Sequence, residues 1–338
     1  MMGSMTGYKI SFIRIAAVAV ACVFCLSSCE KKMPGRLDGK YPDVLSSSSV
    51  EQSVTESSEE KNEDMDTSSA ENEAGEFSAP KFKSGSYVME SSSVNEQYFY
   101  SGKSVISFTR ITQTYSYDIA LTVKKSGAMT AVYTFGRIRT GYETDDGSIS
   151  SDTADKSGRN EDNAVYYDLI GQKFTVNVSK DYKISISGID AIHKKYPYTA
   201  DVVTAENMKE VASDLFYPIE AKLRQGSSWK LTQVGLTNTY TVTGVKDGGV
   251  YVNISGRKLD LPEPYTSGGI KYTYKKRQPL SGSLVMSLDN RMLQEQSSYQ
   301  ENSGVIESGE KKYTFTESAA SVCNIKKEIT ANERTALK

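Results

Sequence analysis

The chain has 338 residues, 38% of them hydrophobic, which suffices for one large domain or two small ones plus tails. Its single histidine excludes a zinc site built on paired histidines. Because the 40 basic and 42 acidic residues nearly cancel, the net charge of −2 does not indicate wholesale binding to nucleic acid.

Residues 1–28 have the pattern of a secretory signal peptide. Lys9 and Arg14 supply a positive start, and an apolar run follows at residues 15–26. A helix needs about 20 residues to cross the roughly 30 Å of hydrocarbon in a bilayer, so this run is too short to span one. We therefore expect the segment to be removed on secretion.

The sequence Leu26-Ser27-Ser28-Cys29 follows directly. It resembles the bacterial lipobox, in which an aliphatic residue and two small residues precede a cysteine that is lipidated and becomes the first residue. The resemblance implies that Cys29 carries the acyl groups that anchor the protein, and two or more acyl chains hold a protein durably on a membrane. Cys22 and Cys25 leave with the signal peptide, so their CxxC spacing indicates no redox or metal site.

Residues 29–80 have the composition of a disordered tether. Within them, residues 41–80 contain 11 acids and one base, a net charge of −10, and few large apolar side chains. Burial there cannot offset the chain entropy that folding would cost. A flexible segment of about 50 residues has an r.m.s. span of roughly 40 Å. Residues 81–338, with a net charge of +4, are the expected extracytoplasmic domain.

The domain shows the alternation typical of antiparallel strands. Apolar and polar residues alternate over residues 115–123 and again over 129–135, which predicts a hairpin. A second, glycine-led hairpin is predicted at 171–188, and the polar stretch 143–163 between them is expected to be a loop. The same order recurs at 240–300, which favours either a weak internal duplication or the ordinary succession of hairpins in an antiparallel protein.

One helix is predicted between the two halves. Thr204 has the character of an N-cap, and apolar side chains then recur at helical spacing until Pro218 ends the segment. A last strand is expected at 312–317. We therefore expect a mainly β fold, with a curved antiparallel sheet, half-barrel or sandwich-like, and one packed amphipathic helix. Its hairpins are either two repeated units or an ordinary succession.

Several of these features together resemble an uncharacterised family of β-rich bacterial lipoproteins. The features are the lipobox, the acidic serine-rich tether, residues 171–179 (GQKFTVNVS) and residues 226–229 (GSSW). The layout is also similar to half-barrel lipoproteins and carriers that hold acyl chains on a concave sheet, an analogy of fold only. The resemblance implies a β-rich, lipid-anchored domain and transfers no ligand-binding residue.

The sequence offers little catalytic chemistry. It contains no G-x-S-x-G and no glycine-rich phosphate loop after a strand. Cys323 is predicted to be a buried thiol rather than a nucleophile that works with His193. The acidic stretch 143–163 is read as a mobile loop rather than a calcium site. Residues 271–277 fit an edge strand protected by lysines, or a surface for a polyanion.

These observations predict a membrane-anchored extracytoplasmic lipoprotein that is a non-catalytic binding module, with no cofactor or metal, for an apolar or amphiphilic ligand. The alternative is an envelope structural or protein-interaction lipoprotein without a small ligand. Expected partners are the membrane, through Cys29, and a lipid, wall polymer or envelope protein, but not nucleic acid. Glu30 is not the aspartate associated with inner-membrane retention, which favours the outer membrane in a host with two membranes.

Overall fold

The computed structural model describes residues 75–200, 202–233, 236–267 and 270–327. The predicted signal peptide, Cys29 and all but the last six residues of the predicted tether lie outside the described residues. The predicted domain lies largely within them.

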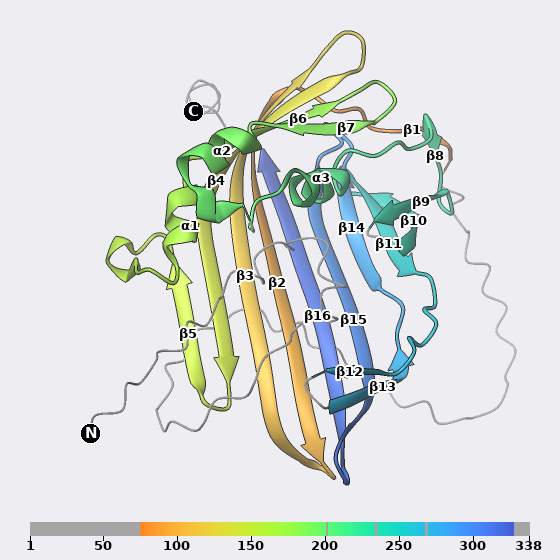
Figure 1. Ribbon diagram of the computed structural model, residues 1–338. Helices are drawn as coiled ribbons and strands as arrows, with labels where there is room; N and C mark the ends of the chain where they lie inside the picture. Colours follow the sequence, from red (N-terminus) through yellow and green to blue (C-terminus); the bar gives the residue numbers. More distant parts are fainter. Residues whose placement is uncertain (1–74, 201, 234–235, 268–269, 328–338) are drawn as a thin grey trace, which may run out of the picture.

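One large antiparallel sheet forms most of the described chain (Figure 1). Its strands follow the order β7-β6-β4-β3-β2-β16-β15-β14-β11-β10-β9, so β7 and β9 are its edges and the sheet is open. The strands on this path are β2 (Gly85–Ser101), β3 (Ser104–Val123), β4 (Met129–Thr144), β6 (Lys173–Val178), β7 (Ile184–Ser187), β9 (Ser228–Gln233), β10 (Leu236–Lys246), β11 (Gly249–Gly256), β14 (Ser281–Ser287), β15 (Leu293–Ser308) and β16 (Lys311–Lys327).

Shorter strands extend the sheet or stand beside it. β5 (Gly147–Asp152) pairs with β4, and β13 (Ile270–Arg277) joins the lower half of β15 to β12 (Tyr265–Ser267). β1 (Phe77–Ser78) and β8 (Lys222–Leu223) form a separate pair. The mainly β fold is therefore confirmed, as one continuous curved sheet rather than two packed sheets.

Four predicted hairpins are confirmed: β3–β4, β6–β7, β10–β11 and β14–β15. In each, at least one strand buries alternate side chains, which is why the sequence shows period two. The proposed duplication stays a prediction, because any meander places its hairpins in this succession. The prediction of a loop for residues 143–163 is wrong, since Gly147–Asp152 forms β5 and continues the β4 hairpin.

The predicted helix is confirmed as α3 (Ala205–Ser213), and the Thr204 hydroxyl accepts the Asn207 N–H at 3.0 Å. The prediction of one helix is wrong, because α1 (Ala164–Leu169) and α2 (Ile189–Lys195) are present, with 3-10 turns η3 (Lys156–Gly158) and η4 (Pro197–Thr199). Helices of six or seven residues are too short to show a periodic pattern.

The helices lie against the upper part of one face of the sheet, which we call the inner face (Figure 1). Beneath them, Tyr117, Tyr133, Phe135 and Phe174 pack with ring centroids 5.0–6.3 Å apart. Each of these side chains is at most 2% exposed. Burying aromatic side chains of this size gives the upper half of the domain its core.

Candidate functional site

The inner face changes character along its strands. Below the apolar core it carries buried polar side chains, which we call the polar band. The polar band consists of Ser91, Ser93, Gln113, Gln296, Gln300, Asn302 and Glu317, each at most 9% exposed. Side chains of this kind are rarely so buried unless they are hydrogen-bonded, so the band needs an explanation.

Strand register brings the polar band onto one face. Ser93 stands opposite Gln113 on β3 and Ser321 on β16, and Asn302 of β15 stands opposite Glu317 of β16. Since alternate residues of a strand share a face, the polar band continues the rows that begin with buried Tyr115 and Met89 in the core.

Three buried oxygen atoms of the polar band have no hydrogen-bond partner at full geometry. Asn302 donates its Nδ2 to Glu317 Oε1 at 2.9 Å, and Gln300 donates its Nε2 to the Gln278 carbonyl at 2.8 Å. Within the described chain, Gln300 Oε1, Asn302 Oδ1 and Glu317 Oε2 have no partner at full hydrogen-bond geometry, although the Tyr274 hydroxyl interacts with the Glu317 carboxyl. Each such buried acceptor costs about 1–3 kcal/mol, and the cost is removed when a donor arrives.

An aromatic cluster borders these oxygens on the next rows of the sheet. Phe315 of β16 is edge-on to Tyr274 at 5.3 Å and to Tyr272 at 6.3 Å, both on β13. Tyr272 stacks on Tyr265 of β12 at 5.0 Å, and Phe99 of β2 lies 6.5 Å from Phe315. Phe315 is buried at 1% exposure, and the four partly exposed rings around it offer apolar surface near the unpartnered acceptors.

Burial dominates the electrostatics of this site. It raises the pKa of the Glu317 carboxyl, although Asn302, Tyr274 and Arg277 act to lower it. Burial and the neighbouring Glu317 likewise raise the pKa of Tyr274. The Arg277 guanidinium lies 5.8 Å from the Tyr274 ring centroid. The Glu317 carboxyl is therefore held in surroundings that disfavour its charge.

This arrangement suits an organic ligand better than a metal ion. The described residues contain no group of three His, Cys, Asp or Glu side chains able to hold a metal. A single carboxylate beside amide oxygens falls short of the set that calcium prefers. Hydroxyl or amine donors would satisfy the three oxygens, while the rings would contact an apolar part of the same ligand.

Glu317→Gln should raise the free energy of unfolding at neutral pH by more than about 0.5 kcal/mol. Most surface substitutions change that free energy by less than this amount. Glutamine keeps the shape and the bond from Asn302 but removes the disfavoured charge. Because the folded-state pKa is raised, wild-type stability should fall as pH rises from 4.5 through the raised value, then level off. Urea unfolding of both proteins across this range measures the difference.

Glu301→Gln is the matched control, because Glu301 lies on β15 beside Asn302 but faces the opposite side. It should stay within about 0.5 kcal/mol of wild type at every pH. A stability gain of Glu317→Gln that is flat with pH, or largest in acid, would contradict the assignment of a buried, charge-disfavouring carboxyl.

The residues singled out by sequence are dispersed. Cys29 lies outside the described residues. Cys323 is a buried thiol, as predicted, and burial raises its pKa. His193 Nε2 lies 2.7 Å from the Val203 carbonyl oxygen, a contact that ties α2 to the segment before α3. These positions give His193 and Cys323 structural roles in the fold.

The acidic residues of 143–163 are engaged in separate local contacts. Glu143 lies 3.7 Å from Arg110, and Asp145 accepts the Ser107 hydroxyl at 3.0 Å. Arg137 donates its Nε to Asp152 at 2.8 Å, and the pKa of Asp152 falls to about 2 chiefly through this hydrogen bond. The carboxylates are thus dispersed over the hairpin instead of converging on one point.

Residues 271–277 lie in β13, which pairs with β15 along most of its length and with β12 only at Ile270, Lys271 and Tyr272. Residues 273–277, with Lys275 and Lys276, have no strand beyond them in the described chain, so this part of β13 is an edge, as predicted. Tyr272 and Tyr274 point to the aromatic cluster, whereas Lys271 lies on the opposite face, 3.7 Å from Glu307. Because tyrosine and lysine alternate here, the tyrosines face the inner side of the sheet and the lysines face solvent.

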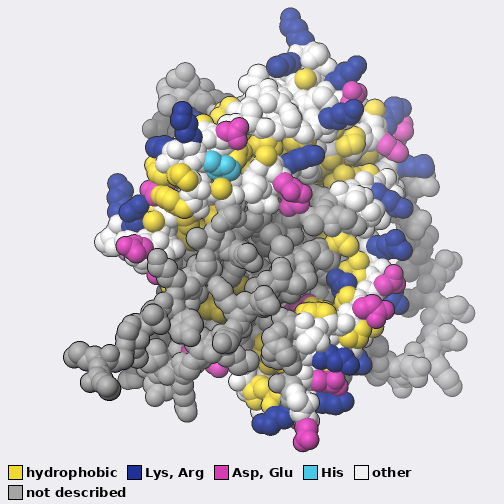
Figure 2. Space-filling model, in the orientation of Figure 1, with side chains coloured by type: hydrophobic (Ala, Val, Ile, Leu, Met, Phe, Trp, Pro, Cys, Tyr) yellow, Lys and Arg dark blue, Asp and Glu magenta, His cyan; other side chains and the backbone are white. Residues whose placement is uncertain are grey.

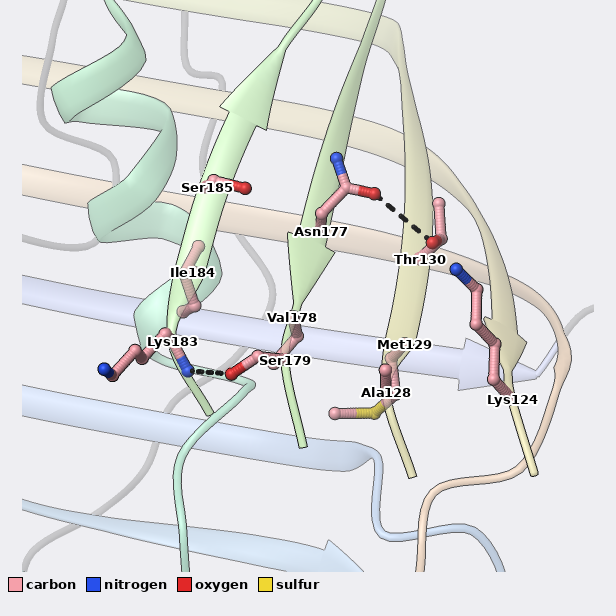
Figure 3. Close-up of a pocket in the computed structure, with 10 residues that line it drawn as sticks. All are labelled: Lys124, Ala128, Met129, Thr130, Asn177, Val178, Ser179, Lys183, Ile184 and Ser185. Atoms are coloured by element: carbon pink, nitrogen blue, oxygen red, sulfur yellow. Dashed lines mark hydrogen bonds between the residues drawn. The ribbon is translucent and has the colours of Figure 1, made fainter. Parts of the chain in front are cut away.

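A shallow pocket of about 390 Å³ lies elsewhere, where the β3–β4 and β6–β7 turns meet (Figure 3). Lys124 and Lys183 flank it, and its wall includes the Thr130 hydroxyl, which donates to Asn177 Oδ1 at 3.3 Å. The Lys183 backbone N–H donates to the Ser179 hydroxyl at 3.0 Å. Its lining mixes these basic and polar side chains with the apolar side chains of Ala128, Met129, Val178 and Ile184.

Comparison with protein-family models gives no match, and comparison with curated proteins gives none either. None of the helices in the described ranges combines the length and the apolar character needed to span a membrane. The site therefore has to be interpreted from its own geometry.

Proposed function

We propose that this chain is a lipid-anchored lipoprotein of the extracytoplasmic face of the cell membrane, and that its β domain is a non-catalytic binding module for an amphiphilic ligand. The signal-peptide pattern and the lipobox ending in Cys29 support the anchor. The ligand would lie on the inner face, where the polar band meets the aromatic cluster.

The row of unpartnered oxygens beside the aromatic rings carries this proposal. A purely apolar ligand would leave Gln300 Oε1, Asn302 Oδ1 and Glu317 Oε2 buried without donors. A purely polar ligand would gain little from Tyr272, Tyr274 and Phe315. A molecule with an apolar chain and a hydroxyl-bearing headgroup satisfies both.

Thermal unfolding of the full secreted chain, made with Cys29→Ser so that no acyl group competes, tests this. Octyl glucoside monomers, which combine an alkyl chain with hydroxyl donors, should raise the midpoint temperature of wild type and of Glu301→Gln. Glu317→Gln should bind at least about tenfold more weakly (~1.4 kcal/mol), because its NH2 group replaces the acceptor at Oε2. Decanoate, whose headgroup has no donor, should not protect.

Two outcomes would contradict the proposal. Equal protection of wild type and Glu317→Gln by octyl glucoside would show that the unpartnered oxygens do not receive the ligand. Equal protection by decanoate would show that the site does not select donors.

The second candidate is an envelope structural or protein-interaction lipoprotein without a small ligand. The observation that favours it is the filled core under the helices, where Tyr117, Tyr133 and Phe174 occupy the inner face. This candidate predicts that neither amphiphile changes the unfolding temperature, and that a defined envelope protein or wall polymer co-purifies with the wild-type chain.

A further inference from the structure

One end of the sheet is strongly basic. We call it the basic end, and it comprises the segment before β2, the four turns β3–β4, β6–β7, β10–β11 and β14–β15, and the last residues of β16. Its exposed charged residues are Lys81, Lys83, Lys124, Lys125, Lys180, Asp181, Lys183, Lys246, Asp247, Asp289, Lys326 and Lys327. Nine lysines against three aspartates give a net charge of +6.

Hydrogen bonds and ion pairs join these segments into one continuous surface. The Val123 N–H donates to Ser84 Oγ at 2.8 Å, and the Leu288 N–H donates to the Gly248 carbonyl at 2.9 Å. Lys83 pairs with Asp289 of the β14–β15 turn. In the space-filling view, basic side chains gather around this upper end of the molecule (Figure 2).

The turns at the two ends of the long strands differ in charge. The turns at the opposite end of the long strands, β2–β3, β4–β5 and β15–β16, carry two lysines and three acids, a net of −1. Solvent-exposed turns tolerate charged residues of either sign, so the need to form turns does not explain why the two ends differ in net charge. Moreover, no ion pair joins Lys124, Lys125, Lys180 or Lys183 to a carboxylate of the described chain.

The basic end also contains the shallow pocket between the β3–β4 and β6–β7 turns (Figure 3). Lys124 and Lys183 flank it, and Asn177, Ser179 and Ser185 line its wall. Met129, Val178 and Ile184 supply apolar lining, and the ammonium and hydroxyl donors beside them can hydrogen-bond a phosphate group.

The chain enters the domain at this same end. β1, near the first described residues, pairs with β8 in the upper part of the fold (Figure 1). Phe82, four residues later, packs on Phe216 at 5.3 Å and under the Arg291 guanidinium at 4.7 Å. A tether anchored at Cys29 would therefore bring the basic end, rather than the opposite turns, toward the membrane.

We propose that the basic end is a docking surface for anionic phospholipid headgroups, so that the domain rests on the membrane that holds its anchor. An anionic leaflet attracts each lysine near its surface, and the attraction fades within a Debye length of about 8 Å. The pocket flanked by Lys124 and Lys183 would receive a headgroup phosphate. This contact is separate from the ligand site on the inner face and does not depend on it.

Vesicle co-sedimentation tests the proposal, using the full secreted chain with Cys29→Ser. The protein should bind vesicles of phosphatidylcholine mixed with phosphatidylglycerol, should release at high salt, and should not bind phosphatidylcholine alone. Changing Lys124, Lys125, Lys180 and Lys183 together to Glu should weaken binding about tenfold or more. Circular dichroism establishes that the variant is folded.

The matched control changes Lys103, Lys275, Lys276 and Lys311 to Glu, four exposed lysines away from the basic end. It alters the net charge equally and should keep most of the binding. An equal loss in both variants would attribute binding to net charge and overturn the proposal. If the four-site variant of the basic end unfolds, the double variant Lys124→Gln with Lys183→Gln is tested in its place. It must also weaken binding to anionic vesicles, by a smaller factor.

Two further outcomes would overturn it. One is an absence of binding to anionic vesicles at low salt. The other is binding that appears only after Glu56, Glu59, Glu60 and Glu63 are changed to Gln, which would assign the basic end to the chain's own acidic segment. Glu317→Gln should bind vesicles as wild type does, which separates this test from that of the inner-face ligand.

Discussion

Arg291→Ala is expected to lower the free energy of unfolding by about 3–5 kcal/mol. Arg291 is 7% exposed, in the turn between β14 and β15. Its Nη1 donates to the Tyr182 hydroxyl at 2.6 Å, and its Nη2 donates to the Tyr217 carbonyl. Alanine would leave that carbonyl without its donor and open a cavity at the meeting point of three segments.

Three aromatic rings surround the Arg291 guanidinium, where an acidic side chain would be the usual partner of a buried arginine. Its central carbon lies 4.7 Å from the Phe82 ring, 5.2 Å from Tyr182 and 5.8 Å from Tyr217. Desolvation lowers the pKa of the guanidinium, but a group that starts at 12.5 stays charged at neutral pH. The stabilisation therefore comes from ring faces and fixed dipoles, and is insensitive to salt.

Arg291→Met separates the contributions. Methionine refills most of the volume but cannot donate, so the loss should fall to about 1–3 kcal/mol. Arg224→Ala, at an exposed position before β9, is the control and should stay within about 0.5 kcal/mol of wild type. Urea unfolding at neutral pH gives all three values. Equal effects of Arg291→Ala and Arg224→Ala would show that Arg291 does not join these segments.

Sequence reasoning located the hairpins because their inner positions are apolar. Tyr117, Ile119 and Leu121 of β3 alternate with polar residues, and the same holds for Phe174 and Val176 of β6. A strand with one face on an apolar core can be recognised in the sequence because its apolar residues recur at every second position. The N-cap at Thr204 could also be predicted, because its hydroxyl accepts a hydrogen bond from Asn207, only three residues along the chain.

The strands that cross the polar band were missed or shortened for the opposite reason. β2 presents Ser91 and Ser93 to the inner face, so most of Gly85–Ser101 reads as a polar connection. β16 was expected only at 312–317, because Ser318 to Ser321 replace large apolar side chains with small ones. The residues that hide these strands from pattern analysis are thus the ones that form the polar band.

The candidate site itself could not be predicted from the sequence for a related reason. Glu317, Asn302 and Tyr274 lie on three strands, and only strand register brings them together. A glutamate between Thr316 and Ser318 carries no sign that it will be 3% exposed. Long-range pairing sets that burial, and nothing in local spacing encodes it.

Gly304→Ala should lower the free energy of unfolding by about 1–3 kcal/mol and should detach β13 from the sheet. Gly304 stands between Tyr274 on β13 and Phe315 on β16. A Cβ atom there would lie 2.4 Å from the Thr273 carbonyl oxygen and 2.5 Å from the Phe315 ring. Because one obstacle is backbone, a change of rotamer alone cannot relieve the clash.

Gly244→Ala is the matched control, since Gly244 also lies in a strand, β10, and a Cβ atom there would meet nothing within 4 Å. Replacing a strand glycine where there is room should leave stability unchanged or raise it by about 0.5–1 kcal/mol. Hydrogen exchange locates the damage: in Gly304→Ala, the amides of β13 should exchange faster while those of β14 keep their protection.

The same variant links the fold to the proposed function. If the rings of β13 hold the apolar part of the ligand against Phe315, Gly304→Ala should also lose protection by octyl glucoside, whereas Gly244→Ala should keep it. A Gly304→Ala protein with faster exchange in β13 but undiminished protection would place the ligand away from the aromatic cluster. The binding site would then have to be sought elsewhere on the inner face, because only β13 brings Tyr272 and Tyr274 to Glu317.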